Sequence, residues 1–115
     1  MESKLLAMTR PRTKPRPLEA VGPSTPIGSH IAVDARLEAA LIAQGITSEN
    51  LIRVGLDDSR VGNWLGCKGQ PNIDAAKVIR AVVGIGLNYL YLGTVNDAPM
   101  EVREFVMSKY PFLVS

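Results

Sequence analysis

The segment from Gly55 to Pro71, with the sequence GLDDSRVGNWLGCKGQP, constrains this chain more than any other. A glycine suited to a tight turn precedes two aspartates and a serine, whose oxygens can accept hydrogen bonds from the N–H groups at a helix start. Val61, Trp64 and Leu65 then follow at i, i+3 and i+4, the spacing of one apolar helix face. The glycines and proline between residues 66 and 71 end the helix. The segment therefore predicts a short helix over residues 58–65 that buries this face on a neighbour.

A second short helix, over residues 47–54, directly precedes this segment. Thr47 is a suitable N-cap, and Glu49 is favourable in the first turn because the helix dipole is positive there. The apolar residues of this helix are expected to point inward: Leu51, Ile52 and Val54. Two short helices joined by a tight turn through glycine form the outline of a helix-turn-helix.

The rest of the chain also predicts helices. In residues 31–43 an apolar face is expected to pack inward while Arg36 and Glu38 face solvent, and Gly45 supplies a left-handed cap. Further helices are expected over residues 72–83 and 87–92, and a last one begins at Pro99. Sustained period-2 alternation, which would indicate a strand, does not occur in the sequence. The predicted fold is all-α, with five helices and an additional C-terminal helix.

The charge and the prolines divide the chain into three parts. Residues 1–28 read as a flexible, basic, Pro-rich arm, residues 29–94 as the helix-turn-helix domain, and residues 95–115 as a C-terminal helical extension. Of the formal net charge of +2, residues 1–29 contribute +3, from five Lys or Arg and two Glu. Residues 30–94 carry six basic and six acidic residues, and residues 95–115 carry two and three. The basic character therefore lies in the arm.

Several classes of function are disfavoured. No apolar run reaches the roughly 20 residues that span a membrane, and the N-terminus does not read as a secretory signal, so a cytoplasmic protein is expected. One cysteine and one histidine cannot build a disulfide framework, a cysteine-based metal site or a visible Ser/His/Asp triad. Paired carboxylates and a nucleophile–base set do not stand out. We expect no enzyme activity, no cofactor and no small-molecule substrate.

The spacing of motifs between Leu37 and Gly93 covers about half of the chain. The positions that carry the pattern are Gly45, Ile46, Thr47, Glu49, Leu51, Gly55, Val61, Asn63, Trp64, Lys68, Pro71, Ile79, Gly84, Ile85, Leu87, Asn88, Tyr89, Leu90 and Gly93. This pattern resembles the lambda-repressor-like, or Cro/Xre-type phage repressor, family of helix-turn-helix proteins. The interval from Leu51 to Gly55 is one residue shorter than in the family, and Ile52 replaces its usual small alanine. The resemblance implies sequence-specific binding of double-stranded DNA by a transcriptional regulator.

The resemblance also implies which residues contact DNA. Base contacts are expected from the second helix of the pair: Asp58, Ser59, Arg60 and Asn63. Arginine matches guanine O6 and N7, asparagine matches adenine N6 and N7, and a carboxylate can accept from cytosine N4. Phosphate contacts are expected from Thr47, Ser48, Lys68 and the arm residues Arg10, Arg12, Lys14 and Arg16. A homodimer is expected, with Val102, Phe105 and Val106 at its contact.

Two alternatives remain open at this level. Asp57 and Asp58 would repel phosphates, and the globular part is neutral, so the module could be a degenerate helix-turn-helix that binds a protein. It could also be the antitoxin of a toxin–antitoxin pair, which would bind both DNA and a toxin. The apolar residues of the last helix could equally be buried against the chain's own helices.

Overall fold

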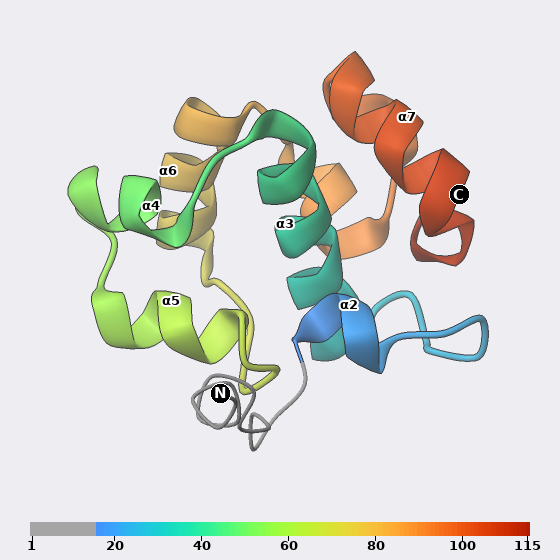
Figure 1. Ribbon diagram of the computed structural model, residues 1–115, viewed down its shortest axis with the longest axis horizontal. Coiled ribbons are helices and arrows are strands. Elements are labelled where there is room, and N and C mark those ends of the chain that lie inside the picture. The colour runs from blue at the N-terminus through green and yellow to red at the C-terminus, as the bar shows by residue number, and fades with distance from the viewer. Residues whose placement is uncertain (1–15) are drawn as a thin grey trace, which may run out of the picture.

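Every regular element in residues 16–115, which the computed structural model describes, is helical. The elements are α2 (Pro17–Ala20), α3 (His30–Gln44), α4 (Ser48–Arg53), α5 (Asp58–Trp64), α6 (Ile73–Val83), the π-helical turn η1 (Asn88–Leu92), the 3₁₀ turn η2 (Val95–Asp97), α7 (Met100–Lys109) and the 3₁₀ turn η3 (Pro111–Leu113). Figure 1 shows their arrangement. The all-α prediction is confirmed, and the helix bounds agree with the expected ones to within one or two residues.

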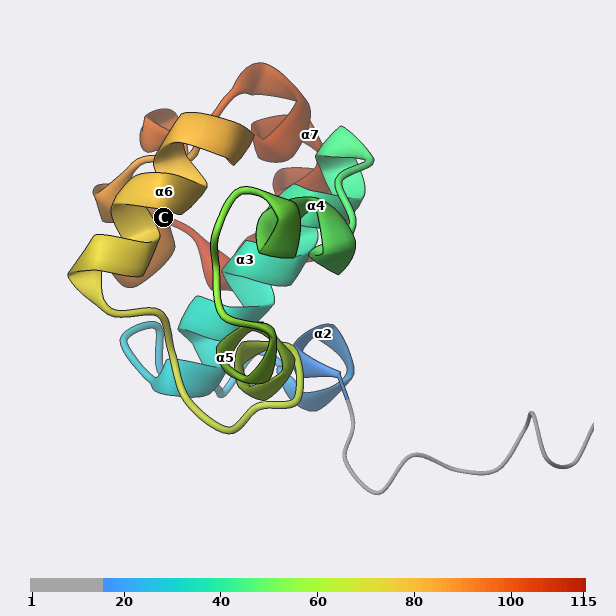
Figure 2. The same ribbon diagram turned by 90° about the vertical axis from the view of Figure 1, so that its left-hand side faces the viewer.

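The central element is α3, which the other helices surround (Figures 1 and 2). Ten consecutive residues, from Ala32 to Leu41, are buried, because α2, α6, η1, α7 and η3 all pack on this helix. The prediction that Arg36 and Glu38 face solvent is therefore wrong. The side of α3 that its sequence assigns to water is covered by segments distant in the sequence, and a helix covered on all sides has no solvent face.

Arg36 is satisfied in the interior by backbone oxygens. Its guanidinium donates to the carbonyl oxygens of Leu90 at 2.9 Å, Leu113 at 2.8 Å, Ile27 at 2.8 Å and Tyr91 at 3.2 Å. Burial lowers the pKa of Arg36 to about 10, so the side chain stays charged at neutral pH. A buried charge is tolerated when its hydrogen bonds are made, and here they join three separate stretches of chain to α3.

Glu38 anchors the start of the described chain. Its carboxylate pairs with the Arg16 guanidinium and accepts from the Leu18 N–H at 3.0 Å. Together with the bond from Arg36 to Ile27, this fastens residues 16–28 to α3. The prediction of a flexible arm extending to residue 28 is wrong for these residues. The charge of Arg16, an expected phosphate contact, is already paired inside the fold.

The α4–α5 pair forms as the sequence predicts. Thr47 caps α4 by accepting from the Asn50 N–H at 3.3 Å, and Gly55, with φ of +107°, makes the turn. Leu51 is buried, but Val54 is exposed, which contradicts its expected inward position. Val54 lies after the last residue of α4, where the chain leaves the helix. The shorter interval before Gly55 still lets α4 pack against α5.

The C-terminal extension is part of the core. α7 lies along α3, and Val102 and Val106 are fully buried there. The prediction that these two valines contact a second copy is wrong, because the chain's own helices cover them. Phe105 is half-buried, with its ring centroid 5.8 Å from that of Tyr110.

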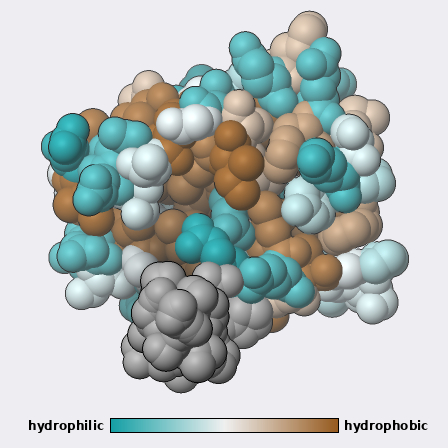
Figure 3. Space-filling view, viewed as in Figure 1, coloured by the Kyte–Doolittle hydropathy of each residue, from teal (hydrophilic) through white to brown (hydrophobic). Residues whose placement is uncertain are grey.

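The large apolar side chains that remain exposed are dispersed. They belong to α3, the end of α4, α6, η1 and α7: Ile42, Val54, Ile73, Leu92, Met100 and Met107. On the face seen in Figure 3, apolar residues are interspersed with hydrophilic ones. A homodimer stays a prediction, now without an assigned contact.

Candidate nucleic-acid interface

α5 presents the residues that were expected to read bases. Val61 and Trp64 are buried, while all four predicted base contacts are exposed: Asp58, Ser59, Arg60 and Asn63. At 100° per residue, Ser59 and Asn63 lie opposite the buried pair, on the outer face of the helix. Arg60 lies on the flank of α5 that faces α6, and Asp58 lies on the other flank.

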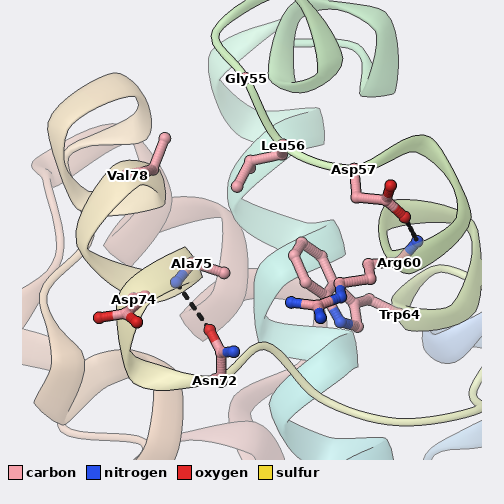
Figure 4. Close-up of a pocket in the computed structure, with 9 residues that line it drawn as sticks. All are labelled: Gly55, Leu56, Asp57, Arg60, Trp64, Asn72, Asp74, Ala75 and Val78. Carbon is pink, nitrogen blue, oxygen red and sulfur yellow. Dashed lines mark hydrogen bonds between the residues drawn. The ribbon is translucent and has the colours of Figure 1, made fainter.

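Two adjoining hollows separate α5 from α6. The first, of about 280 Å³, is lined by Gly55, Leu56, Asp57, Arg60, Trp64, Asn72, Asp74, Ala75 and Val78. Figure 4 shows the Arg60 and Trp64 side chains of α5 facing Asn72 and Asp74 at the start of α6. The second, of about 220 Å³, is lined by Arg60, Asn63, Trp64, Lys68, Gly69, Gln70 and Asn72. The two hollows share three of these residues and therefore form one cleft.

The two ends of the cleft differ in charge. The second hollow is lined by two cations, Arg60 and Lys68, and by three amides, and carboxylates are not among its lining residues. One amide belongs to Asn72, whose oxygen accepts from the Ala75 N–H at 2.8 Å, so its NH₂ group is what it can offer a ligand. The first hollow instead contains Asp57 and Asp74. The Lys68 end of the cleft thus presents mainly hydrogen-bond donors, as an anion requires.

The loop between α5 and α6 holds Lys68 in place. The Lys68 N–H donates to the Asn63 carbonyl oxygen at 2.8 Å, and the Tyr91 hydroxyl donates to the Pro71 carbonyl oxygen. The left-handed residue of this loop is Cys67, with φ of +64°, rather than one of the neighbouring glycines. Burial, with a smaller contribution from the Asp34 carboxyl, raises the pKa of the Cys67 thiol. The thiol is therefore protonated at neutral pH, which agrees with an inert side chain.

Asp34, on α3, is a feature that the sequence analysis missed. It is buried, and neither of its carboxyl oxygens has a hydrogen-bond partner. Burial raises its pKa to about 8, and the backbone N–H of Gly69, from the Lys68 loop, opposes this shift only in part. The available signal was an acidic residue between Val33 and Ala35, but an aspartate on an amphipathic helix usually faces water.

The other expected phosphate contacts do not line the cleft. The Thr47 hydroxyl takes part in capping α4, where it accepts from the Asn50 N–H and lies 3.1 Å from the Asn50 side-chain oxygen. Ser48 is half-buried in the first turn of the same helix. Arg10, Arg12 and Lys14 lie outside the described residues. Of the predicted DNA contacts, the structure therefore brings together Arg60, Asn63 and Lys68.

Comparison with known proteins adds no family assignment, since no family model, curated protein or solved structure matches the chain. Within residues 16–115, His, Cys, Asp and Glu side chains form no group of three that could hold a metal ion. No helix of that described part combines the length and the apolar character needed to cross a membrane.

Proposed function

We propose that the protein binds double-stranded DNA sequence-specifically through α5, as a transcriptional regulator of the phage-repressor type. The observation that carries the proposal is the exposed polar face of α5 beside a hollow lined by Arg60, Lys68 and three amides. Phosphate contacts position a protein on DNA, and base-edge contacts supply specificity. This part of the surface presents both kinds of group on adjacent elements.

In this mechanism α5 enters the major groove. The Asn63 amide pairs with adenine N6 and N7, Ser59 contacts a neighbouring base edge, and Asp58 accepts from cytosine N4 at the start of the helix. Arg60 takes a different role from the one expected, because it lies on the flank that faces α6. Arg60 and Lys68 together bind the phosphate backbone beside the groove.

The acidic residues define how the DNA approaches. Asp57 and Asp74 lie in the first hollow and would repel a phosphate placed there. The backbone therefore crosses the cleft at the Lys68 end. A homodimer would place two α5 helices in successive major grooves, about 34–36 Å apart, and so double the number of contacts.

A protein-binding role is the second candidate. It is favoured by three exposed carboxylates near α5: Asp57, Asp58 and Asp74. These residues suit a basic protein partner, as in a degenerate helix-turn-helix or an antitoxin that also binds a toxin.

Selection of binding sites from random double-stranded DNA, followed by fluorescence anisotropy at two salt concentrations, tests the proposal. We expect an enriched motif and an affinity that falls steeply with salt. Enrichment of no sequence, together with salt-independent retention on DNA, would leave the protein-binding role as the better explanation.

A further inference from the structure

Gly62 is the one glycine inside an α-helix among residues 16–115. Glycine is among the weakest helix formers, and α5 has only seven residues, so a glycine at its centre weakens the helix. Alanine would fit the local backbone, since Gly62 is not among the glycines with positive φ. A side chain placed there would meet nothing within 4 Å. The fold of the chain itself gives no reason for glycine at this position.

Other glycines have an evident structural reason. A Cβ at Gly86 would overlap the Asp97 carboxylate, and Gly93 has φ of +76° with the Leu113 carbonyl oxygen 2.7 Å from the position of a Cβ. Glycine is also favoured where a backbone must closely approach a ligand. The open space around Gly62 is consistent with this explanation, because it lies on the outside of the molecule.

The position of Gly62 on α5 fits a close approach. By helical spacing it lies on the outer face between Ser59 and Asn63, opposite the buried Val61 and Trp64. The missing side chain leaves the helix backbone as the floor of a shallow depression. A hydroxyl and an amide stand on either side of this floor, so a ligand there meets apolar C–H groups between two polar side chains.

We propose that Gly62 lets the α5 backbone touch the edge of a base pair, and that the group seated on it is the C5-methyl of a thymine. This inference rests on the proposed DNA binding. Gly62 offers the groove no side-chain donor or acceptor, and the thymine methyl is the apolar group that a base pair presents there. Consecutive Cα atoms lie 3.8 Å apart, close to the 3.4 Å step between base pairs. The thymine therefore belongs to the pair next to the adenine that Asn63 reads.

The test combines one helix variant with a modified DNA. Gly62→Ala is compared with Gly28→Ala, a control at a glycine that also has open space and lies between α2 and α3. The DNA is the site that the wild-type protein selects, with uracil replacing thymine at single positions to remove the methyl group. Affinity is measured by anisotropy, and folding by thermal melting.

We expect Gly62→Ala to melt at a higher temperature than the wild type yet bind the selected site about tenfold more weakly, because its methyl would occupy the space of the base edge. Gly28→Ala should bind within about twofold of the wild type. Uracil next to the preferred adenine should weaken wild-type binding by about two- to fivefold.

Two results would overturn the inference alone. If Gly62→Ala binds the selected site as tightly as the wild type, the backbone does not make this contact. If uracil leaves wild-type affinity unchanged at every thymine, the methyl is not the group that is recognised. Failure of the wild-type protein to select any DNA would instead remove the proposed function, and this inference with it.

Discussion

The Arg36 guanidinium on α3 donates a hydrogen bond to the carbonyl oxygen of Leu113, 77 residues further along the chain, over 2.8 Å. The same side chain also donates to Leu90 of η1 and to Ile27, before α3. The Ser115 N–H in turn donates to the Gly93 carbonyl oxygen at 2.9 Å. The last residues of the chain are therefore held against the centre of the fold, and the C-terminal segment is a structural part of the domain.

Replacing Arg36 tests this role. Arg36→Met keeps much of the side-chain volume but leaves several buried carbonyl oxygens without a donor, at a cost of about 1–3 kcal/mol for each unpaired group. We expect the free energy of unfolding to fall by at least about 3 kcal/mol in urea denaturation. Arg80→Met, at an exposed position of α6, is the matched control and should change it little. Equal unfolding midpoints for the two variants would contradict the anchoring role.

Asp34 predicts how stability depends on pH. Its pKa rises from 3.8 to about 8 on folding, because burial disfavours the carboxylate. Between these values the folded state holds a proton that the unfolded state has lost, so the contribution is complete below about pH 4 and is lost as pH rises through 8. We expect the free energy of unfolding to fall by about 1.4 kcal/mol per pH unit over this range from Asp34.

The measurement is the unfolding free energy of the wild type and of Asp34→Asn between pH 5 and 9. Asparagine cannot ionise, so the downward slope should flatten in this variant. Asp74→Asn, exposed on α6, should keep the wild-type slope. A slope that persists in Asp34→Asn would assign the pH dependence to another group.

Local sequence signals predicted most of the helices and their caps, as Thr47 and Gly45 illustrate. They did not predict the burial of Arg36 and Glu38, because the segments that cover these side chains come from residues 16–28 and from the C-terminal half. Helical periodicity describes one helix and carries no information about distant segments that pack on it. The buried face of Val102 was recognised as apolar for the same reason, but its partner was not.

The candidate site shows the same division. The exposure of Asn63 and Ser59 followed from the apolar spacing of Val61 and Trp64 on a single helix. The position of Arg60 in a cleft did not, because that cleft depends on where α6 begins relative to α5.

Truncation tests whether α7 completes the core. Val102 and Val106 are fully buried against the rest of the chain, and removing residues 98–115 would expose the apolar side of α3. We expect the shortened chain to lose its cooperative thermal transition, followed by circular dichroism. Met107→Ser, an exposed change on α7, should melt close to the wild type. A truncated chain that still unfolds cooperatively at the wild-type temperature would show that α7 is dispensable.

Lys68 and Asn63 should affect DNA binding in different ways, although both line the second hollow. Lys68→Ala removes a phosphate contact, so affinity should fall by a similar factor on all sequences, and the slope of log K against log salt should decrease by about 0.9. Asn63→Ala removes a base contact, so it should cost about 1–3 kcal/mol on the selected site and relax preference at one position. Lys77→Ala, exposed on α6 and outside the lining of both hollows, controls for the general loss of charge. Anisotropy titrations of all three variants on selected and scrambled DNA at several salt concentrations separate these effects. Equal losses for Asn63→Ala on both DNAs would make Asn63 a backbone contact and would require another residue of α5 to supply specificity.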